Sequence, residues 1–347
     1  MKVDLVTPGG PLARIQELAK AAEAGGFSGL VFVESGRTAF LSATAAALTA
    51  PSLDLATGIA VAFSRSPMVT AQLAWELADV TGGRFRLGLG TQVRAHIERR
   101  FSAAFDHPGP RLREYVSALR AIFAAFRGEE RLDFKGDFYS FSLLTPPWSP
   151  GRIVHDHPTI DVAGVNPWML RMAGEVADGL HVHPLNHPAW LRDTVLAAVA
   201  EGAARAGRDP AALTLFVPTF VAAGDTEESL AAARDGVRRQ IAFYGSTPNY
   251  AFLFDELGFE GTTERLRAHQ KAGNAEAMAT EISDELLDHL SVCGPWDELA
   301  GRLVERHRGV ADRVVLYLTG EDVFGGRDDI ERWGAVAAEV VRRSAAG

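Results

Sequence analysis

The sequence predicts a single (β/α)8 barrel, the α/β fold in which parallel strands alternate with helices around a closed sheet. Three observations support this prediction. Eight apolar runs of strand length recur along the chain. Segments with helical periodicity separate them, so neighbouring strands must pair in parallel through crossovers. Eight strands suit one closed barrel better than an open doubly wound sheet, which more often has about five to seven. We therefore expect one domain over residues 1–347.

The first half of the barrel is predicted from short apolar runs between helix signals. Ser66 is a suitable helix N-cap, Pro67 suits the first helical turn, and Gly82 with Gly83 ends that helix. Two further helices are expected over residues 12–22, before a pair of glycines, and over the alanine-rich residues 42–50. The strands that these helices connect are expected at residues 3–6, 29–34, 53–62 and 84–90.

The second half continues the pattern and adds insertions after strands four and seven. We expect these insertions over about residues 94–158 and 245–290. In the first, Lys135 and Gly136 favour a hairpin turn, and residues 128–158 are expected to lie over the barrel mouth. The second is expected to hold several short helices. The remaining strands are expected at residues 159–163, 180–184, 213–222 and 312–318, and the helices at 112–126, 166–177, 190–206, 226–244, 295–308 and 330–341.

Composition and charge exclude several classes of function. The formal net charge is -9 and the pI about 5.6, whereas nucleic acids and anionic membranes attract basic surfaces. No apolar run reaches the roughly 18 residues of a membrane span, and MKVDLVTPGG is typical of a strand, not of a signal peptide. We therefore expect a cytoplasmic protein with no nucleic-acid or membrane partner. We also expect a homodimer that acts on a small molecule. Cys293 is the only cysteine and is expected to be an unreactive thiol.

Polar side chains follow several predicted strands at their carboxyl ends, where barrel enzymes place their chemistry. Glu34 ends strand two, His96 lies in the cationic segment after strand four, and His183 lies on strand six. Each of these three side chains can transfer a proton, so they are candidate acid–base residues. The turn GVNP after strand five begins a helix at Asn166, and its free backbone N–H groups suit an anion.

Five separated blocks of the sequence resemble a known family. They are TGIAVAFSRSP, GRFRLGLGTQ, RAHIERRF, DVAGVNPWMLRMAGEVADGLHVHP and QIAFYGSTPNY. Together, and in this order, they resemble the luciferase-like flavin or deazaflavin monooxygenase superfamily, specifically its coenzyme F420-dependent oxidoreductase branch. The resemblance extends from Val3 to about Tyr317. It implies a (β/α)8 barrel that binds coenzyme F420 at its mouth.

The resemblance also implies which residues hold the cofactor. It implies a non-prolyl cis peptide bond between Gly58 and Ile59, in a bulge that backs the deazaflavin ring. Thr91 and Gln92 would contact the polar edge of the ring. Residues 163–166 would form the phosphate-binding turn, in which relatives commonly have glycine in place of Asn166. The three groups are Gly58, Ile59 and Ala60; Thr91 and Gln92; and Ala163, Gly164, Val165 and Asn166.

The implied reaction is hydride transfer between position five of the deazaflavin and a small organic substrate. The protein would hold the substrate against the ring and move one proton, for which Glu34, His96 and His183 are the candidates. Arg94 and Tyr244 are expected to contact the substrate. Sugar-phosphate dehydrogenases of this superfamily have a histidine after the acidic residue of strand two. Ser35 stands there in this chain, so that activity is not expected.

Two other functions compete with this interpretation. A member of the same superfamily could use FMN and act as a monooxygenase. A metal-dependent barrel hydrolase would need ligands from different strand ends, which His181 and His183 could supply together with residues 155–157. We expect no metal, because those ligands assemble only loosely. Glu34 also has a second interpretation, as a hydrogen-bonded rim residue without a catalytic role.

Overall fold

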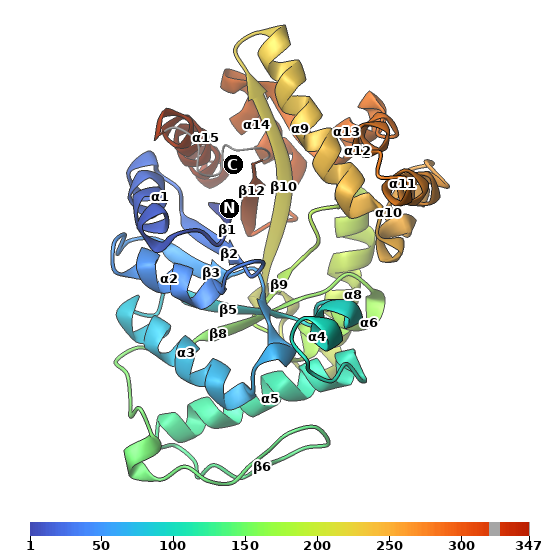
Figure 1. The fold of residues 1–347 in the computed structure, drawn as a ribbon. Helices are drawn as coiled ribbons and strands as arrows, with labels where there is room; N and C mark the ends of the chain where they lie inside the picture. The colour runs from blue at the N-terminus through green and yellow to red at the C-terminus, as the bar shows by residue number, and fades with distance from the viewer. Residues whose placement is uncertain (319–326, 347) are drawn as a thin grey trace.

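Eight parallel strands close into a barrel in the computed structural model, which describes residues 1–318 and 327–346 (Figure 1). The sheet closes because β9 pairs with β10 and β12 pairs with β1. The predicted fold class is therefore confirmed, and each predicted strand is present. In order around the barrel, the strands are β1 (Lys2–Pro8), β2 (Gly29–Val33), β3 (Asp54–Thr57), β5 (Phe85–Gly90), β8 (Thr159–Ala163), β9 (Gly179–His181), β10 (Thr214–Gly224) and β12 (Arg313–Tyr317).

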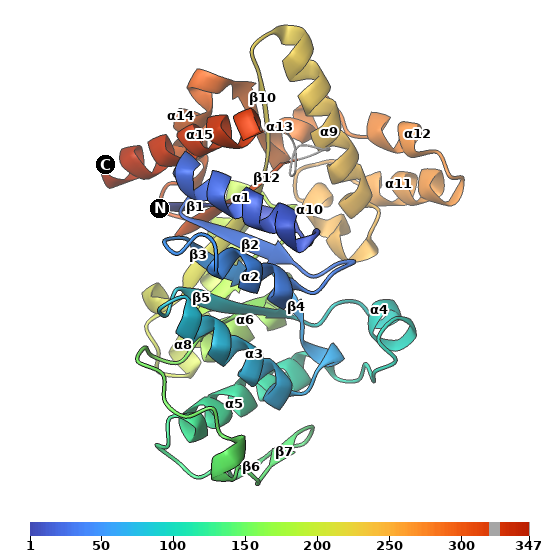
Figure 2. The same ribbon diagram turned by 60° about the vertical axis from the view of Figure 1, so that its left-hand side comes forward.

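Helices surround the barrel, as Figures 1 and 2 show. Two predictions need small corrections. The second helix begins three residues early, at Ala39. The helix expected over 190–206 is divided into α7 (Pro188–Trp190), a π-helical stretch (Leu191–Leu196) and α8 (Ala197–Arg205). None of the helices in residues 1–318 and 327–346 combines the length and apolarity of a membrane span. The other covering helices are α1 (Leu12–Gly25), α2 (Ala39–Ala47), α3 (Pro67–Val80), α5 (Pro108–Phe126), α6 (Pro167–Val176), α9 (Glu227–Gly245), α14 (Trp296–His307) and α15 (Arg327–Ala345).

The segment between α5 and β8 forms the predicted hairpin, from β6 (Phe134–Lys135) and β7 (Ser140–Phe141). Its expected place over the barrel mouth is wrong. The Glu114 carboxylate on α5 accepts hydrogen bonds from the backbone N–H groups of residues 137–139, and the Trp75 indole on α3 donates to the Gly151 carbonyl. The segment therefore packs on the outward faces of α5 and α3, where Figure 2 shows the hairpin.

The region after α9 contains short helices, as expected, and one strand that the sequence did not predict. β11 (Ser291–Pro295) pairs with the last residues of β10, which extend beyond the barrel. Its five residues, SVCGP, end in glycine and proline, so they lack the pattern of a strand. The remaining short elements are β4 (Ala60–Val61), η1 (Ala62–Ser64), α4 (Arg94–Arg99), η2 (Pro146–Trp148), η4 (Pro210–Ala212), η5 (Pro248–Tyr250), α10 (Ala251–Asp255), α11 (Thr262–Lys271), α12 (Ala275–Thr280) and α13 (Asp284–Leu290).

Ion pairs fill the barrel interior at the amino-terminal end of its strands. The Arg313 guanidinium donates to both carboxylate oxygens of Asp4 at 2.7 and 2.6 Å and to Asp54 at 2.8 Å, and Arg86 donates to both oxygens of Asp161. Each buried charge is thus paired. An apolar layer follows toward the mouth, made of Val6, Val31, Ala56, Phe216 and Val315. These two layers fill the barrel at the amino-terminal end of its strands. A binding site inside the barrel can therefore lie only at the carboxyl-terminal end.

Candidate active site

The three groups of residues that match the cofactor site lie on adjoining strands. Ala60 pairs with Leu89 of β5, and Leu89 pairs with Val162 of β8. The segments 58–60, 91–92 and 163–166 follow β3, β5 and β8, so they meet at one part of the carboxyl-terminal rim. We call this part of the rim the β3–β8 sector. Residues that are more than a hundred positions apart in the chain are thereby brought together.

The first group forms an irregular link between β3 and β4. The Gly58–Ile59 peptide bond is cis in the structure, the geometry that the sequence resemblance implied. A Cβ atom on Gly58 would lie 2.2 Å from Cγ1 of Val31, and one on Gly90 would lie 2.7 Å from Cδ1 of Ile59. Gly58 is therefore required by the close approach of the buried Val31 side chain, and Gly90 leaves room for the Ile59 side chain. Ile59 is half-buried, whereas Ala60 is fully covered.

The second group turns the chain from β5 into α4. Gln92 has a left-handed backbone with φ of 55°, which is uncommon for residues other than glycine. Its side-chain oxygen accepts a hydrogen bond from the Val93 N–H at 3.3 Å, and the Thr91 hydroxyl donates to the Gln92 carbonyl at 3.1 Å. The amide nitrogen of the Gln92 side chain has no partner among the described residues. It is thus a free donor at the rim.

The third group leads into the amino terminus of α6. The Asn166 side chain caps this helix by accepting the Met169 N–H at 3.0 Å, as its N-cap position predicts. The Gly164 N–H donates to the His181 carbonyl at 3.3 Å. Within the described part of the chain, the N–H groups of Val165, Asn166 and Trp168 have no acceptor. Free N–H groups at a helix amino terminus can bind an anion such as a phosphate.

Glu34 is held in an ion pair rather than left free. One of its carboxylate oxygens accepts from the Val61 N–H at 2.8 Å and from Arg65 at 2.9 Å, and the other accepts a second hydrogen bond from Arg65. The carboxylate is buried and has three donors. This arrangement corresponds to the second interpretation of Glu34, in which the side chain fixes the rim and does not exchange protons.

His96 and Arg94 lie on α4, which projects from the barrel in Figure 2. Both side chains are exposed. The Arg94 guanidinium donates to Glu98 at 2.7 Å, one helical turn later, and lies 5.2 Å from the centre of the Phe105 ring. α4 begins two residues after Gln92 of the β3–β8 sector, but both side chains face solvent and the charge of Arg94 is already paired.

His183 follows β9 and is packed among rings. Its imidazole lies 3.8 Å from the Tyr250 ring in a stack and 5.1 Å from the Tyr244 ring, edge to face. Burial lowers the pKa of His183 to about 3, so the ring is neutral at physiological pH. Because Nδ1 accepts the Leu185 N–H at 3.1 Å, the proton of the neutral ring is on Nε2. His183 can therefore donate one hydrogen bond, and at neutral pH it does not supply a charge.

Three residues near these groups were missed by the sequence analysis: Arg65, Tyr250 and Tyr317. Arg65 directly precedes the N-cap Ser66, and its rim position next to Glu34 could have indicated a pair. Tyr317 alternates with Arg313 and Val315 on β12, so strand periodicity places it on the inner face at the carboxyl end. Tyr250 lies in the block GSTPNY, and its sequence carries no signal that it would pack on His183.

The ligands of a barrel hydrolase are not brought together. His155 packs against Gly82 and Gly83, at the end of α3, and His157 stacks 6.0 Å from the Phe123 ring on α5. Both lie on the helical shell, away from His183. Among residues 1–318 and 327–346, no group of three or more potential ligands is close enough to hold a metal ion. The observed geometry therefore does not support this alternative.

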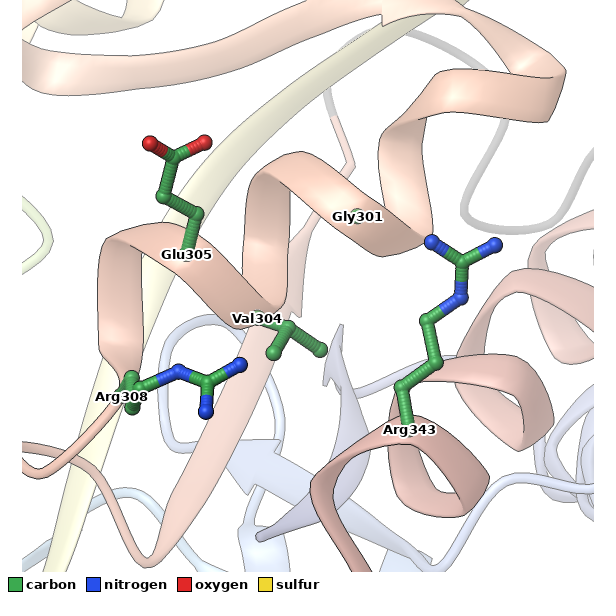
Figure 3. A pocket seen from close by; sticks show the side chains of 5 residues that line it. All are labelled: Gly301, Val304, Glu305, Arg308 and Arg343. Carbon is green, nitrogen blue, oxygen red and sulfur yellow. The ribbon is translucent and has the colours of Figure 1, made fainter. Parts of the chain in front are cut away.

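A surface hollow of about 530 Å³ lies between α14 and α15. Figure 3 shows Val304 between the guanidinium groups of Arg308 and Arg343, with Glu305 pointing away from both. The hollow lies near the carboxyl ends of these two helices. Barrel helices run antiparallel to the strands, so this end is opposite the mouth. The hollow is therefore separate from the rim residues.

Known proteins are similar to this chain over most of its length. The model of the luciferase-like monooxygenase family matches residues 2–313. An uncharacterized protein of Mycobacterium tuberculosis is 42% identical over 304 residues, which are 88% of this chain and 89% of that protein. The 5,10-methylenetetrahydromethanopterin reductase of Methanolobus tindarius is 25% identical over 301 residues, covering 86% and 88%. The coenzyme F420-dependent tetrahydromethanopterin reductase of Methanopyrus kandleri has the same fold, with a TM-score of 0.81, 18% identity and 99% of each chain covered.

Proposed function

The chain belongs to the luciferase-like monooxygenase family, and we propose that it is an F420-dependent oxidoreductase that transfers a hydride between the deazaflavin and a small organic substrate. One observation carries the proposal. The three separated blocks that resemble the cofactor site of the F420-dependent branch meet in the β3–β8 sector, on strands that pair with one another. If the blocks resembled the family only as isolated motifs, they would not need to lie next to one another in the fold.

The residues of the β3–β8 sector fit a planar cofactor with an anionic tail. The free N–H groups of Val165 and Trp168, at the start of α6, are donors for a phosphate. The free side-chain amide of Gln92 is a donor for the polar edge of a ring. When bound there, a reduced deazaflavin would supply a hydride and no radical chemistry. The protein would then bind the tail, orient the ring and exclude water.

The proton that accompanies the hydride must come from the chain or from water. Of the three side chains expected to provide it, Glu34 is engaged by Arg65 and His96 is exposed on α4. His183 has the best position, because its Nε2–H can donate to a substrate while the ring stays neutral. We therefore assign Glu34 a positioning role and His183 a contact with the substrate.

The experiment that tests the proposal is a titration of the purified protein with F420 and, separately, with FMN, followed by cofactor fluorescence. We expect micromolar or tighter binding of F420. A hundredfold preference for FMN would overturn the choice of cofactor and favour an FMN-dependent monooxygenase of the same family. The variant Trp168→Pro, which removes one free N–H group, should weaken F420 binding. Position 168 lies in the first turn of α6, where its N–H makes no intrahelical hydrogen bond, so α6 should still form.

A further inference from the structure

Four ring side chains gather at the carboxyl end of the barrel, on the side that runs from β9 to β12. They are His183 after β9, Tyr244 on α9, Tyr250 in η5 and Tyr317 at the end of β12. We call them the aromatic cluster. In the closed strand order, β12 is four strands away from β5, so the two are on opposite sides of the barrel. Tyr317 and Val315 share one face of β12, and Val315 lines the interior.

The hydroxyl groups of Tyr244 and Tyr317 form a hydrogen bond of 2.5 Å. The Gln240 side chain lies one turn earlier on α9, close enough to lower the pKa of the Tyr244 hydroxyl. If Tyr244 donates to Tyr317, the O–H of Tyr317 has no acceptor among the described residues. The Phe220 ring, 5.2 Å from the Tyr317 ring, supports Tyr317 from β10. With donation in this direction, Tyr317 presents one free, oriented donor.

The aromatic cluster is uncharged over the whole physiological range of pH. Burial raises the pKa of Tyr250 to about 12, and it also raises the pKa values of Tyr244 and Tyr317. Burial lowers the pKa of His183 to about 3. Within the part of the chain that the structure describes, no charged side chain contributes to these four shifts. The cluster can therefore bind an uncharged polar group, but it offers no partner for a carboxylate or a phosphate.

We propose that Tyr317 donates a hydrogen bond to the oxygen of an uncharged ketone or aldehyde substrate and is the catalytic proton donor, with Tyr244 as its positioning residue. This inference rests on the proposed function. The carbonyl carbon gains a hydride from the reduced deazaflavin, which is oxidised by two electrons, as the C=O π bond breaks. The oxygen gains the proton of Tyr317, Tyr317 regains one from Tyr244, and Tyr244 regains one from water.

Two features make this assignment chemically reasonable. An alkoxide is a stronger base than a phenolate, so proton transfer from Tyr317 to the developing alkoxide is favourable even though burial disfavours the phenolate. The donor is also fixed before the substrate arrives, because its hydroxyl is held by Tyr244 and its ring by Phe220. The rings of Tyr250 and His183 then favour a substrate with a flat apolar body, such as an aryl ketone.

The test uses the protein loaded with oxidised F420, which binds but cannot deliver a hydride, and acetophenone labelled with ¹³C at its carbonyl. Infrared difference spectra report hydrogen bonds to that oxygen. We expect a shift of the carbonyl band to lower frequency in the wild-type complex, loss of most of this shift in Tyr317→Phe, and loss of part of it in Tyr244→Phe. F420 binding, measured first by fluorescence, should be unchanged in both variants.

Tyr115→Phe is the matched control. Tyr115 also makes a 2.5 Å hydroxyl–hydroxyl hydrogen bond, to Thr70, but between α5 and α3 outside the barrel. This variant should keep the wild-type carbonyl band. With reduced F420, we expect Tyr317→Phe to lower the rate of acetophenone reduction on the order of 100-fold.

The outcomes separate the two proposals. If the wild type fails to bind F420, the proposed function fails before acetophenone is added. If F420 binds but acetophenone does not bind at millimolar concentration, or if its carbonyl band is the same in the wild type and in Tyr317→Phe, the inference about Tyr317 alone is overturned. A band that changes equally in Tyr115→Phe and Tyr317→Phe would also overturn it, because the effect would then be a general loss of packing.

Discussion

The Arg65 guanidinium binds both carboxylate oxygens of Glu34 and so joins the end of β2 to the turn that precedes α3. The Val61 N–H donates to the same carboxylate at 2.8 Å. Both partners follow the 58–60 segment, which holds the first group of rim residues, and the Glu34 N–H donates to the Ile59 carbonyl within that segment at 3.4 Å. The pair therefore fixes the backbone on which a cofactor ring would rest.

We predict that Arg65→Met lowers the free energy of unfolding by about 3–5 kcal/mol, because Glu34 would remain buried without its cation. Glu34→Gln keeps the shape of the side chain and should lower it by about 1–3 kcal/mol. Urea denaturation measures both values. Arg94→Met removes the exposed pair with Glu98 and should change stability by less than about 0.5 kcal/mol. Equal effects of the Arg65 and Arg94 variants would contradict the structural role of the Glu34 pair.

A second prediction concerns the helix cap at the proposed phosphate site. Asn166→Ala should lower the free energy of unfolding by about 1 kcal/mol, because the Met169 N–H loses its acceptor. The same change frees that N–H group for a phosphate, so F420 should bind more tightly. Ser66→Ala removes the equivalent cap of α3, where the Ser66 hydroxyl accepts from Val69, and should lower stability alike without changing F420 affinity. Calorimetry and fluorescence titration distinguish the two effects. Weaker F420 binding in Asn166→Ala would mean that the Asn166 side chain itself contacts the cofactor.

The barrel could be predicted from the sequence because its strands are buried on both faces and its helices carry regular apolar stripes. Contacts between side chains that are distant in the sequence could not be predicted in this way. The rim positions of Glu34 and Arg65 can suggest a pair, but the sequence does not show that Arg65 binds both carboxylate oxygens, and Tyr317 has no partner until α9 brings Tyr244 to it. The segment 128–158 was misplaced for the same reason, because its position depends on Glu114, a residue of an already predicted helix.

A third prediction concerns the effect of pH on stability. His307 is fully buried, its Nε2 lies 2.9 Å from the Thr219 hydroxyl, and burial together with the nearby charge of Arg306 lowers its pKa from 6.5 to about 3. Below pH 6.5 the unfolded chain binds a proton that the folded protein does not, so His307 destabilises the fold as the pH falls from 6.5 toward 3. When the pH is lowered from 7.5 to 5.5, the free energy of unfolding should decrease in the wild type. In His307→Gln we expect this decrease to be smaller by about 1 kcal/mol.

Urea denaturation at the two pH values measures this difference. His96→Gln is the control, because this exposed side chain makes no hydrogen bond or ion pair among the described residues, so the wild-type loss of stability should remain. The same loss in the wild type and in His307→Gln would show that His307 does not stay neutral in the folded protein.

The last prediction tests the close packing behind the β3–β4 link. A Cβ atom at position 58 would lie 2.2 Å from Cγ1 of Val31, which is buried in the apolar layer of the barrel and cannot move away. We expect Gly58→Ala to lower the free energy of unfolding by about 1–3 kcal/mol and to weaken F420 binding. Val31→Ala removes the obstructing methyl group and leaves a small cavity. In the double variant the new methyl group occupies that cavity, so the two changes should together cost at least about 0.5 kcal/mol less than the sum of their separate effects. Additive losses would show that the alanine side chain at position 58 disturbs the link by some route other than its contact with Val31.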